Sequence, residues 1–219
     1  MKKTILKLSM FVLVAGTLVW TGCKSDDKTA PVITLKGNAT ETVVYGATYA
    51  DAGATANDDK DGDITSKITV TVTPTDFHNN VAGAYVYTYN VSDAAGNAAT
   101  PVTRTVNVVI LNTTMDGTYL ESENCSGTGN NSGTGTIVHS TSTTGRILIS
   151  NFALNSSATV YADLSGTFGT TVTIPSQLIG SDYYSGTGTI SNNASTITIA
   201  YKDSTSAGSQ TCTSTYTRQ

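Results

Sequence analysis

The sequence predicts an all-β protein with two consecutive domains, a β-sandwich followed by a small antiparallel β-barrel or meander. After residue 30, apolar residues alternate with polar ones in short runs, as expected of strands with one buried face. Clusters of Gly, Asn, Asp and Ser, which favour turns, separate these runs. Charged residues make up only 13% of the chain, whereas Thr, which favours strands, is abundant.

The net charge of the chain limits the kinds of partner that it can bind electrostatically. With Lys plus Arg at 12 and Asp plus Glu at 16, the net charge is −4. Nucleic-acid binding and electrostatic binding to anionic lipid headgroups both need clustered Lys and Arg. The composition therefore argues against nucleic acid as a partner and against a purely electrostatic membrane contact.

The N-terminus has the features of an export signal. Lysines precede an apolar stretch from about Leu8 to Trp20, which is shorter than a transmembrane helix and has the proportions of a signal peptide. The sequence VWTGC then resembles the lipobox of bacterial lipoproteins, with Trp20 in place of the usual Leu. That resemblance implies that residues 1–22 are a signal peptide and that Cys23 carries a lipid. The alternative is an ordinary signal peptide with a chance Cys.

Residues 23–30 are expected to be a polar tether after the lipid. The tether contains KSDDK, which resembles the acidic export signal of Bacteroidota-type lipoproteins. The resemblance implies a lipid-anchored protein of the outer membrane that faces the cell exterior. A plain solvated tether is the alternative.

Residues 31–111 are expected to form a β-sandwich of the immunoglobulin type, because short strands and turn signals recur over about 80 residues. Tyr85, Tyr87, Tyr89 and Val91 share one face of a strand. No Cys lies in this segment, so its core lacks the disulfide of antibody domains. The expected strands cover residues 33–35, 42–45, 68–73, 85–91 and 103–110.

Three segments of this domain carry a family resemblance. YADAGAT (49–55), DGDIT (61–65) and YNVSDAAGN (89–97) closely resemble a bacterial immunoglobulin-like domain, first noted in an insecticidal crystal toxin and found in bacterial surface proteins. The likeness runs across the whole domain. It implies a spacer or adhesion module and no catalytic chemistry.

An acid-rich turn, NDDKDGD, contains Asp58, Asp59, Asp61 and Asp63. Carboxylate oxygens on a Gly-containing turn suit Ca²⁺, so these four residues are a candidate calcium site. The turn matches the opening of an EF-hand loop, but Ile68 stands where the bidentate Glu belongs. The favoured alternative is a polar turn in which Asp side chains accept backbone N–H groups.

Residues 112–219 are expected to form about eight sequential antiparallel strands, enough to close into a small barrel or half-barrel. Ile197, Ile199 and Tyr201 share one strand face, and the Gly-rich stretch 126–133 is expected to be a flexible loop. The expected strands cover residues 115–119, 134–139, 146–152, 159–164, 170–174, 183–191, 195–201 and 210–217.

Cys125 and Cys212 remain once Cys23 carries a lipid. One follows the first expected strand of the second domain, and the other lies in the last. First and last strands are neighbours in a closed meander, and an exported location permits oxidation, so a disulfide is expected. Two free or metal-binding thiols are the alternative.

The second domain also carries a looser resemblance. A Gly-x-Tyr start, an early Cys, ISNF, TIP, SGTGTI and a final Cys-x-x-x-Tyr look like the lipocalin-like β-domain of small bacterial lipoproteins. Lipocalins hold apolar ligands in the barrel mouth, but the modest interior side chains make a filled core an equal expectation. Tyr183 and Tyr184 are adjacent, so one must face outward, where its ring can stack on a sugar.

The sequence predicts no enzyme. His78 and His139 lack a fixed spacing to an acid and a nucleophile, and no G-x-S-x-G, H-E-x-x-H or phosphate-loop motif occurs. Acid pairs for glycoside hydrolysis need only converge in space, and the second domain has few acids.

The expected function is therefore that of a non-catalytic cell-surface lipoprotein. Its immunoglobulin-like stalk presents the C-terminal domain for adhesion, display or assembly. The expected partners are the membrane, through the lipid, and a surface glycan or protein. Binding of a glycan or small apolar ligand by the C-terminal domain is the second interpretation, and a hydrolase is the third.

Overall fold

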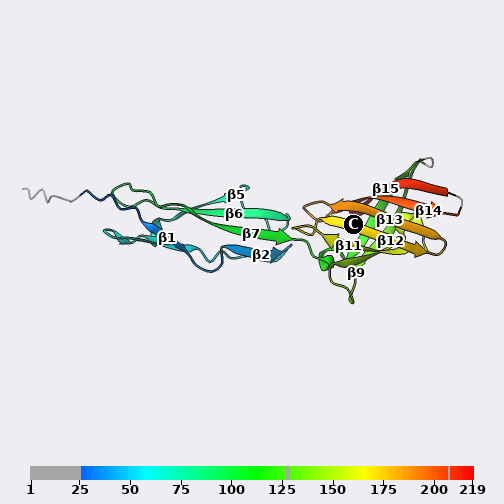
Figure 1. Cartoon of the computed structure of the whole chain (residues 1–219), viewed down its shortest axis with the longest axis horizontal. Coiled ribbons are helices and arrows are strands. Elements are labelled where there is room, and N and C mark those ends of the chain that lie inside the picture. Colours follow the sequence, from blue (N-terminus) through cyan, green and yellow to red (C-terminus); the bar gives the residue numbers. More distant parts are fainter. Residues whose placement is uncertain (1–25, 127–128, 207) are drawn as a thin grey trace, which may run out of the picture.

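A computed structural model describes residues 26–126, 129–206 and 208–219. These residues form two bodies placed end to end along the long axis of the molecule (Figure 1). The N-terminal body consists of two sheets and is called the sandwich below; the C-terminal body is a closed barrel. The predicted all-β fold, a sandwich followed by a barrel, is confirmed. In the described ranges, no helix combines the length and apolar character that a bilayer crossing needs.

The two sheets of the sandwich have the orders β1-β3-β4 and β2-β7-β6-β5. Strand β2 runs parallel to β7, and the other pairs are antiparallel. The strands are β1 (Val32–Leu35), β2 (Thr40–Val44), β3 (Ala54–Asp58), β4 (Gly62–Asp63), β5 (Thr69–Thr73), β6 (Gly83–Asn90) and β7 (Val102–Val109), with the 3₁₀ turn η1 (Thr65–Lys67) between β4 and β5. The strands expected from the sequence do not include β3 and β4, because Ala, Asn, Gly and Asp are depleted in strands.

Strands β6 and β7 supply much of the sandwich core. Tyr85, Tyr87 and Tyr89 are buried along β6, as their alternation predicts, and Val106 and Val108 are fully buried on β7. Each buried aromatic or aliphatic side chain of this kind contributes about 1.5–3 kcal/mol relative to an exposed one. The tyrosine-rich strand therefore packs as the central element of this core.

Arg104 lies in the core at an inward position of β7, in phase with the two valines, and is 0% exposed. Its guanidinium donates to the carboxylate of Asp51, which also accepts the Tyr89 hydroxyl at 2.7 Å. It also donates to three backbone carbonyl oxygens, those of Lys36, Asn38 and Gly53. The buried charge is thus paired and hydrogen-bonded, and it joins two loops to the β6–β7 pair.

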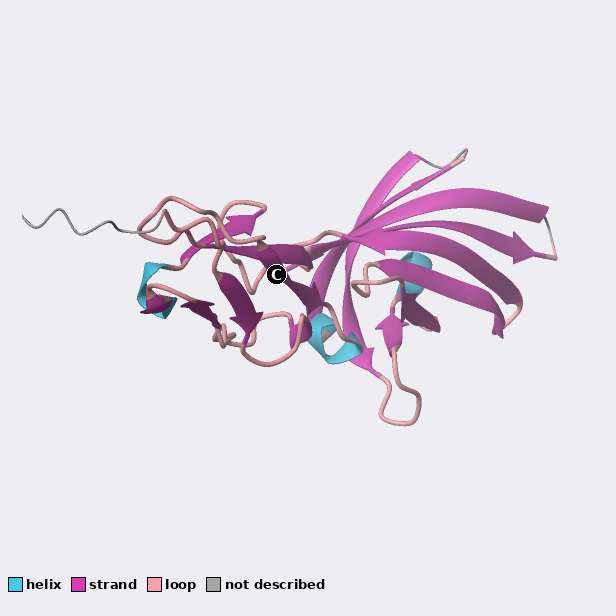
Figure 2. Ribbon diagram, turned by 60° about the vertical axis from the view of Figure 1, so that its left-hand side comes forward, coloured by secondary structure: helices cyan, strands magenta, loops and turns pink. Residues whose placement is uncertain are grey.

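The barrel consists of eight antiparallel strands in sequential order, closed where β15 pairs with β8. Its long strands fan out on the side away from the sandwich (Figure 2). The strands are β8 (Gly117–Cys125), β9 (Gly129–His139), β10 (Arg146–Ser150), β11 (Thr159–Ser165), β12 (Thr171–Ile179), β13 (Asp182–Ile190), β14 (Thr196–Thr205) and β15 (Gly208–Arg218). Closure leaves no exposed sheet edge in these strands.

One expectation about the barrel is wrong. The sequence predicts a loop over the Gly-rich stretch 126–133, but β9 begins at Gly129 and residues 129–133 pair with residues 121–125 of β8. This part of β9 has no alternation of apolar residues, because its side chains are small and polar. The neighbouring strand provides the pairing that local propensity does not.

Aromatic rings fill the centre of the barrel. The 3₁₀ turn η3 (Phe152–Leu154) inserts Phe152, whose ring centroid lies 5.5 Å from that of Tyr184, 4.8 Å from that of Tyr201 and 6.4 Å from that of Tyr216. All four side chains are buried. Between a filled core and a ligand cavity, the packing at this centre favours the filled core.

The sandwich and the barrel are joined by short backbone contacts. The N–H of Ala82 donates to the carbonyl oxygen of Asn192 at 2.7 Å, and that of Ile110 donates to the carbonyl oxygen of Phe168 at 2.8 Å. At Gly169, a Cβ would lie 2.0 Å from the Ile110 carbonyl oxygen, so this close approach requires glycine. Ala82 and Ile110 are buried in the hydrophobic cluster of the barrel, which fixes the joint. The 3₁₀ turn η2 (Asn112–Met115) follows it.

Candidate functional site

The lipidation candidate Cys23, like the whole predicted signal segment 1–22, lies outside the described residues. The described chain begins at Asp26, at the end of the sandwich far from the barrel (Figure 1). The tether and the barrel therefore occupy opposite ends of the sandwich.

Cys125 and Cys212 form a disulfide. They face each other directly in the β8–β15 pair, with Cα atoms 4.0 Å apart, and both are buried. The predicted disulfide is therefore present in the structure. Glu123 lies close to the two sulfurs, but disulfide sulfurs are not thiolates, so these three residues do not make a metal site.

Two carboxylates point into the barrel beside the disulfide. Glu121 and Glu123 occupy alternate inward positions of β8 and are 0% and 7% exposed. The hydroxyls of Ser214 and Tyr216 each donate to Oε1 of Glu121 at 2.7 Å, and the hydroxyl of Tyr201 donates to Glu123. Oε2 of Glu121 is buried without a hydrogen-bond partner.

These contacts set the protonation of the cluster. Burial raises the pKa of the Glu121 carboxyl, although the Ser214 and Tyr216 hydroxyls oppose the shift. Burial also raises the pKa of Tyr201 and of Tyr216, so both stay neutral and act as donors. This cluster is not among the sites predicted from the sequence. The sequence does contain a sign of it, because the two acids alternate with Tyr119 and Cys125 in TYLESENC and so share the inward face of the strand.

The stability of the barrel is expected to fall with rising pH because of Glu121. Its pKa is higher in the folded chain than the ordinary value of 4.5, so the folded state holds the proton more tightly than the unfolded state. The stabilisation is complete below the unfolded pKa and is lost as the pH rises through the folded pKa. Urea unfolding between about pH 5 and 8 should show this slope, and Glu121→Gln should flatten it.

Asp163 provides the matched control for this slope. Hydrogen bonds from Arg146 lower the pKa of Asp163. The stability that the Asp163 carboxylate contributes is therefore lost only as the pH falls through this lowered pKa. Asp163→Asn should therefore leave the slope unchanged. An unaltered slope in Glu121→Gln would count against the protonated carboxyl.

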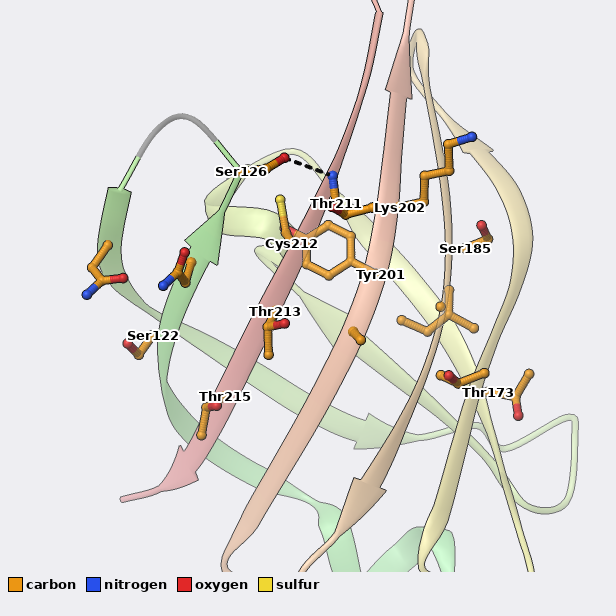
Figure 3. Close-up of a pocket in the computed structure, with 16 residues that line it drawn as sticks. Ser122, Ser126, Thr173, Ser185, Tyr201, Lys202, Thr211, Cys212, Thr213 and Thr215 are labelled. Atoms are coloured by element: carbon orange, nitrogen blue, oxygen red, sulfur yellow. Dashed lines mark hydrogen bonds between the residues drawn. The ribbon is translucent and has the colours of Figure 1, made fainter.

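The outer face of the barrel carries an open depression of about 1120 Å³ lined mainly by Ser, Thr and Asn (Figure 3). A row of outward residues crosses five paired strands here, namely Thr173, Thr187, Ala200, Thr213 and Asn124. At one edge the backbone N–H of Thr211 donates to the Ser126 hydroxyl at 3.4 Å. Hydroxyl and amide groups so arranged can exchange hydrogen bonds with a polar ligand.

The remaining aromatic and imidazole candidates lie apart from this depression. Tyr183 faces outward and is 52% exposed, whereas Tyr184 is buried, as their adjacency predicts. Neither of them lines the depression. Nδ1 of His139 lies 2.6 Å from the Asp116 carboxylate, whereas His78 belongs to the turn before β6 in the sandwich.

The four acids of the NDDKDGD turn have different partners. Asp59 lies 3.9 Å from the Lys60 ammonium. Asp61 accepts the backbone N–H of Ala94 at 2.6 Å, and Asp63 accepts that of Thr65 at 2.9 Å. Hydrogen bonds from Thr65 lower the pKa of Asp63. These contacts match the alternative to a calcium site, a polar turn in which Asp side chains accept backbone N–H groups.

Asp58 instead turns inward and meets two acids from elsewhere in the chain. Carboxylate oxygens of Asp27, Asp58 and Asp93 all lie within 4.8 Å of one another. Of the four candidate calcium ligands, the structure places only Asp58 in this cluster, and its two partners lie outside the acidic turn. Acidic and amide residues recur in the SDAAGN turn, but nothing local indicates that this turn contacts the tether.

Comparison with known proteins concerns mainly the sandwich. Residues 33–108 match the family described as bacterial surface protein, Ig-like domain. Among curated proteins, no sequence matches this chain.

The similar solved structures are distant. A lipoprotein from Bacteroides thetaiotaomicron is 13% identical, with a TM-score of 0.35, and the match covers 86% of this chain and 100% of that one. The CBM51-2 and INT domains of Clostridium perfringens ZmpB, in complex with GlcNAc, are 18% identical with a TM-score of 0.30, covering 86% of this chain and 44% of that one. The match to the family model identifies the domain: residues 33–108 of this chain are an immunoglobulin-like domain of the kind found in bacterial surface proteins.

Proposed function

We propose that the protein is a non-catalytic cell-surface lipoprotein, anchored by a lipid on Cys23. In this proposal residues 31–111 form a stalk that presents residues 112–219, the barrel, for adhesion, display or assembly. The observation that carries it is the end-to-end arrangement, in which the start of the described chain and the barrel lie at opposite ends of the sandwich (Figure 1). A lipid placed just before Asp26 holds the barrel a full sandwich length away from the membrane.

The joint between the two bodies supports the role of a stalk. Beyond the two backbone hydrogen bonds described above, the hydroxyl of Tyr45 donates to the carbonyl oxygen of Asn193 at 2.7 Å. Contacts from the end of β2, from the turn before β6 and from the end of β7 therefore hold the barrel at several points. A joint held in this way keeps the barrel in a fixed direction instead of letting it swing on a linker.

Fatty-acid labelling tests the anchor. Cells grown with labelled palmitate are expected to incorporate label into the wild-type chain and into the double variant Cys125→Ala, Cys212→Ala, which keeps the lipobox. Cys23→Ala should incorporate none, because the thiol that accepts the diacylglyceryl group is gone. Label that persists in Cys23→Ala, or that is missing from the wild type, would contradict the proposal.

The polar depression on the barrel supports a second candidate function, glycan binding. Its hydroxyl and amide groups match the hydrogen-bonding groups of a sugar, and its open shape admits a chain. A glycan array probed with the purified chain should give selective binding that Thr213→Val with Asn124→Ala weakens by about tenfold, or about 1.4 kcal/mol. Leu178→Ala, which alters an exposed residue outside the depression, is the control. Absence of binding to any glycan would remove this candidate.

A further inference from the structure

Three aspartates from separate parts of the chain meet at the tether end of the sandwich. Asp27 belongs to the tether, Asp58 ends β3, and Asp93 lies in the turn after β6. Their carboxylate oxygens lie within 4.8 Å of one another. Asp58 is 3% and Asp93 is 8% exposed, so two of the three negative charges are withdrawn from water.

The hydrogen bonds around Asp58 leave one oxygen free. Its Oδ1 accepts the backbone N–H groups of Lys60 at 3.0 Å and Asp61 at 2.9 Å. Its Oδ2 is buried and has no hydrogen-bond partner. A buried carboxylate oxygen without a partner is costly unless a cation or a donor satisfies it.

Asn97 holds the other two acids in place. Its backbone N–H donates to Oδ1 of Asp93 at 2.8 Å, and its side-chain amide donates to Oδ2 of Asp93 at 2.7 Å. The same amide donates to the backbone carbonyl of Asp27 at 3.0 Å, and the Asp27 carboxylate accepts the backbone N–H of Thr29, also at 3.0 Å. The tether is therefore bound where its own charge is repelled by Asp58 and Asp93.

Two of the lysines near this cluster form ion pairs with other acids. In the described part of the chain, Lys60 pairs with Asp59 and Lys67 pairs with Asp61. Lys28 and Lys60 line an adjoining hollow of about 510 Å³, and the Lys60 side chain is 57% exposed. Three like charges held this close repel one another, and a cation among them would relieve that repulsion.

We propose that Asp27, Asp58 and Asp93 bind one Ca²⁺ ion. Three carboxylates with oxygens this far apart suit an ion that binds oxygen at about 2.3–2.6 Å, takes six to eight ligands and tolerates irregular geometry. Mg²⁺ needs a tighter octahedron, at about 2.0–2.1 Å, and Zn²⁺ prefers nitrogen and sulfur. The free Oδ2 of Asp58 gains its missing partner, and water in the adjoining hollow completes the coordination.

A cation here clamps the tether to the sandwich. Because Asp27 follows Cys23 closely in the sequence, the ion fixes the base of the stalk relative to the start of the chain. The site depends only on residues of the sandwich and the tether, so it stands or falls separately from the lipid on Cys23.

The test uses the full chain in detergent, stripped with chelator and titrated with CaCl₂. Calorimetry should show one site with a dissociation constant of about 0.1–1 mM, the range of extracellular calcium modules. About 10 mM Ca²⁺ should raise the melting temperature of the sandwich by about 5 °C or more, and chelator should reverse the rise. Backbone amides of residues 26–29, 58–61 and 93–97 should exchange more slowly with Ca²⁺.

Three variants separate the site from general effects of the ion. Asp58→Asn should abolish binding. Asp27→Asn, which changes an acid of the tether, should weaken binding at least tenfold while the stability without metal stays the same or rises. Asp59→Asn, in the same turn but beside Lys60, should bind Ca²⁺ like the wild type.

Several outcomes would overturn the proposal. These are no heat and no melting shift in the wild type, unchanged binding in both Asp27→Asn and Asp58→Asn, or loss of binding in Asp59→Asn. Equal protection by the same concentration of Mg²⁺ would also overturn it, because that would be an effect of ionic strength or of divalent charge alone.

Discussion

Replacing Arg104 with Met is expected to lower the free energy of unfolding of the sandwich by about 3–5 kcal/mol. The substitution leaves the Asp51 carboxylate without its cation and leaves the backbone carbonyls of Lys36 and Asn38 without the guanidinium donor, whereas the carbonyl of Gly53 keeps the backbone N–H of Lys36. Removing one partner of a buried ion pair costs far more than the pair itself contributes, because the remaining charge is stranded. Burial also raises the pKa of the Tyr89 hydroxyl, so Tyr89 remains a neutral donor and cannot replace the cation.

Arg146 gives the matched control for this prediction. It makes two hydrogen bonds to Asp163, at 2.7 and 3.0 Å, and lies over the ring of Tyr161, but its side chain is 28% exposed. Arg146→Met should therefore destabilise the chain far less than Arg104→Met does. Urea unfolding measures both variants, with hydrogen exchange resolved at β6 and β7 for Arg104→Met and at β10 and β11 for Arg146→Met. Equal losses in the two variants would refute the role given to Arg104.

Breaking the Cys125–Cys212 disulfide should destabilise the barrel by about 4–5 kcal/mol and leave the sandwich almost unchanged. The bridge closes a loop with a sequence separation of 87, and the chain-entropy model gives this magnitude for a loop of that length, less any strain. The bridge also ties β15 to β8, the pair that closes the barrel.

The double variant Cys125→Ala, Cys212→Ala and the reduced wild type should agree in this measurement. Hydrogen exchange should show faster opening in β8 and β15 and little change in β6 and β7. Arg104→Met should act on the sandwich, whereas the loss of the disulfide should act on the barrel. Comparing these two variants tests whether the two bodies unfold separately. If losing the disulfide destabilised both bodies equally, they would form one cooperative unit.

Alternation decided which strands the sequence could predict. The runs at 85–91 and 197–201 place large apolar residues at every second position, and they lie in β6 and β14 with one buried face, except that β6 ends at Asn90. Strands β3 and β4 and the start of β9 contain small or polar residues, so no alternation marks them in the sequence. Their positions are set by pairing with β1, β3 and β8. The burial of Arg104 was also missed, although the residue is in phase with Val106 and Val108.

The candidate sites show the same limit. Pairing of Cys125 with Cys212 followed from the closure of a sequential meander, since closure makes the first and last strands neighbours. The acidic turn identified Asp58, but its partners Asp27 and Asp93 come from the tether and from another turn. Nothing in their residue type predicts that Glu121 and Glu123 point into the barrel, because a carboxylate is rarely buried. For the aspartate and glutamate clusters, the missing information was contact between residues far apart in the sequence, which a single sequence does not contain.

Surface labelling of intact cells tests the central claim, that the stalk presents the barrel outside the cell. An epitope tag placed after Ser142, in the exposed turn between β9 and β10, should bind antibody equally well on intact and on permeabilised cells. A tag on a cytosolic protein should be labelled only after permeabilisation. Labelling of the Ser142 tag only after permeabilisation would contradict the proposal that the barrel faces the exterior.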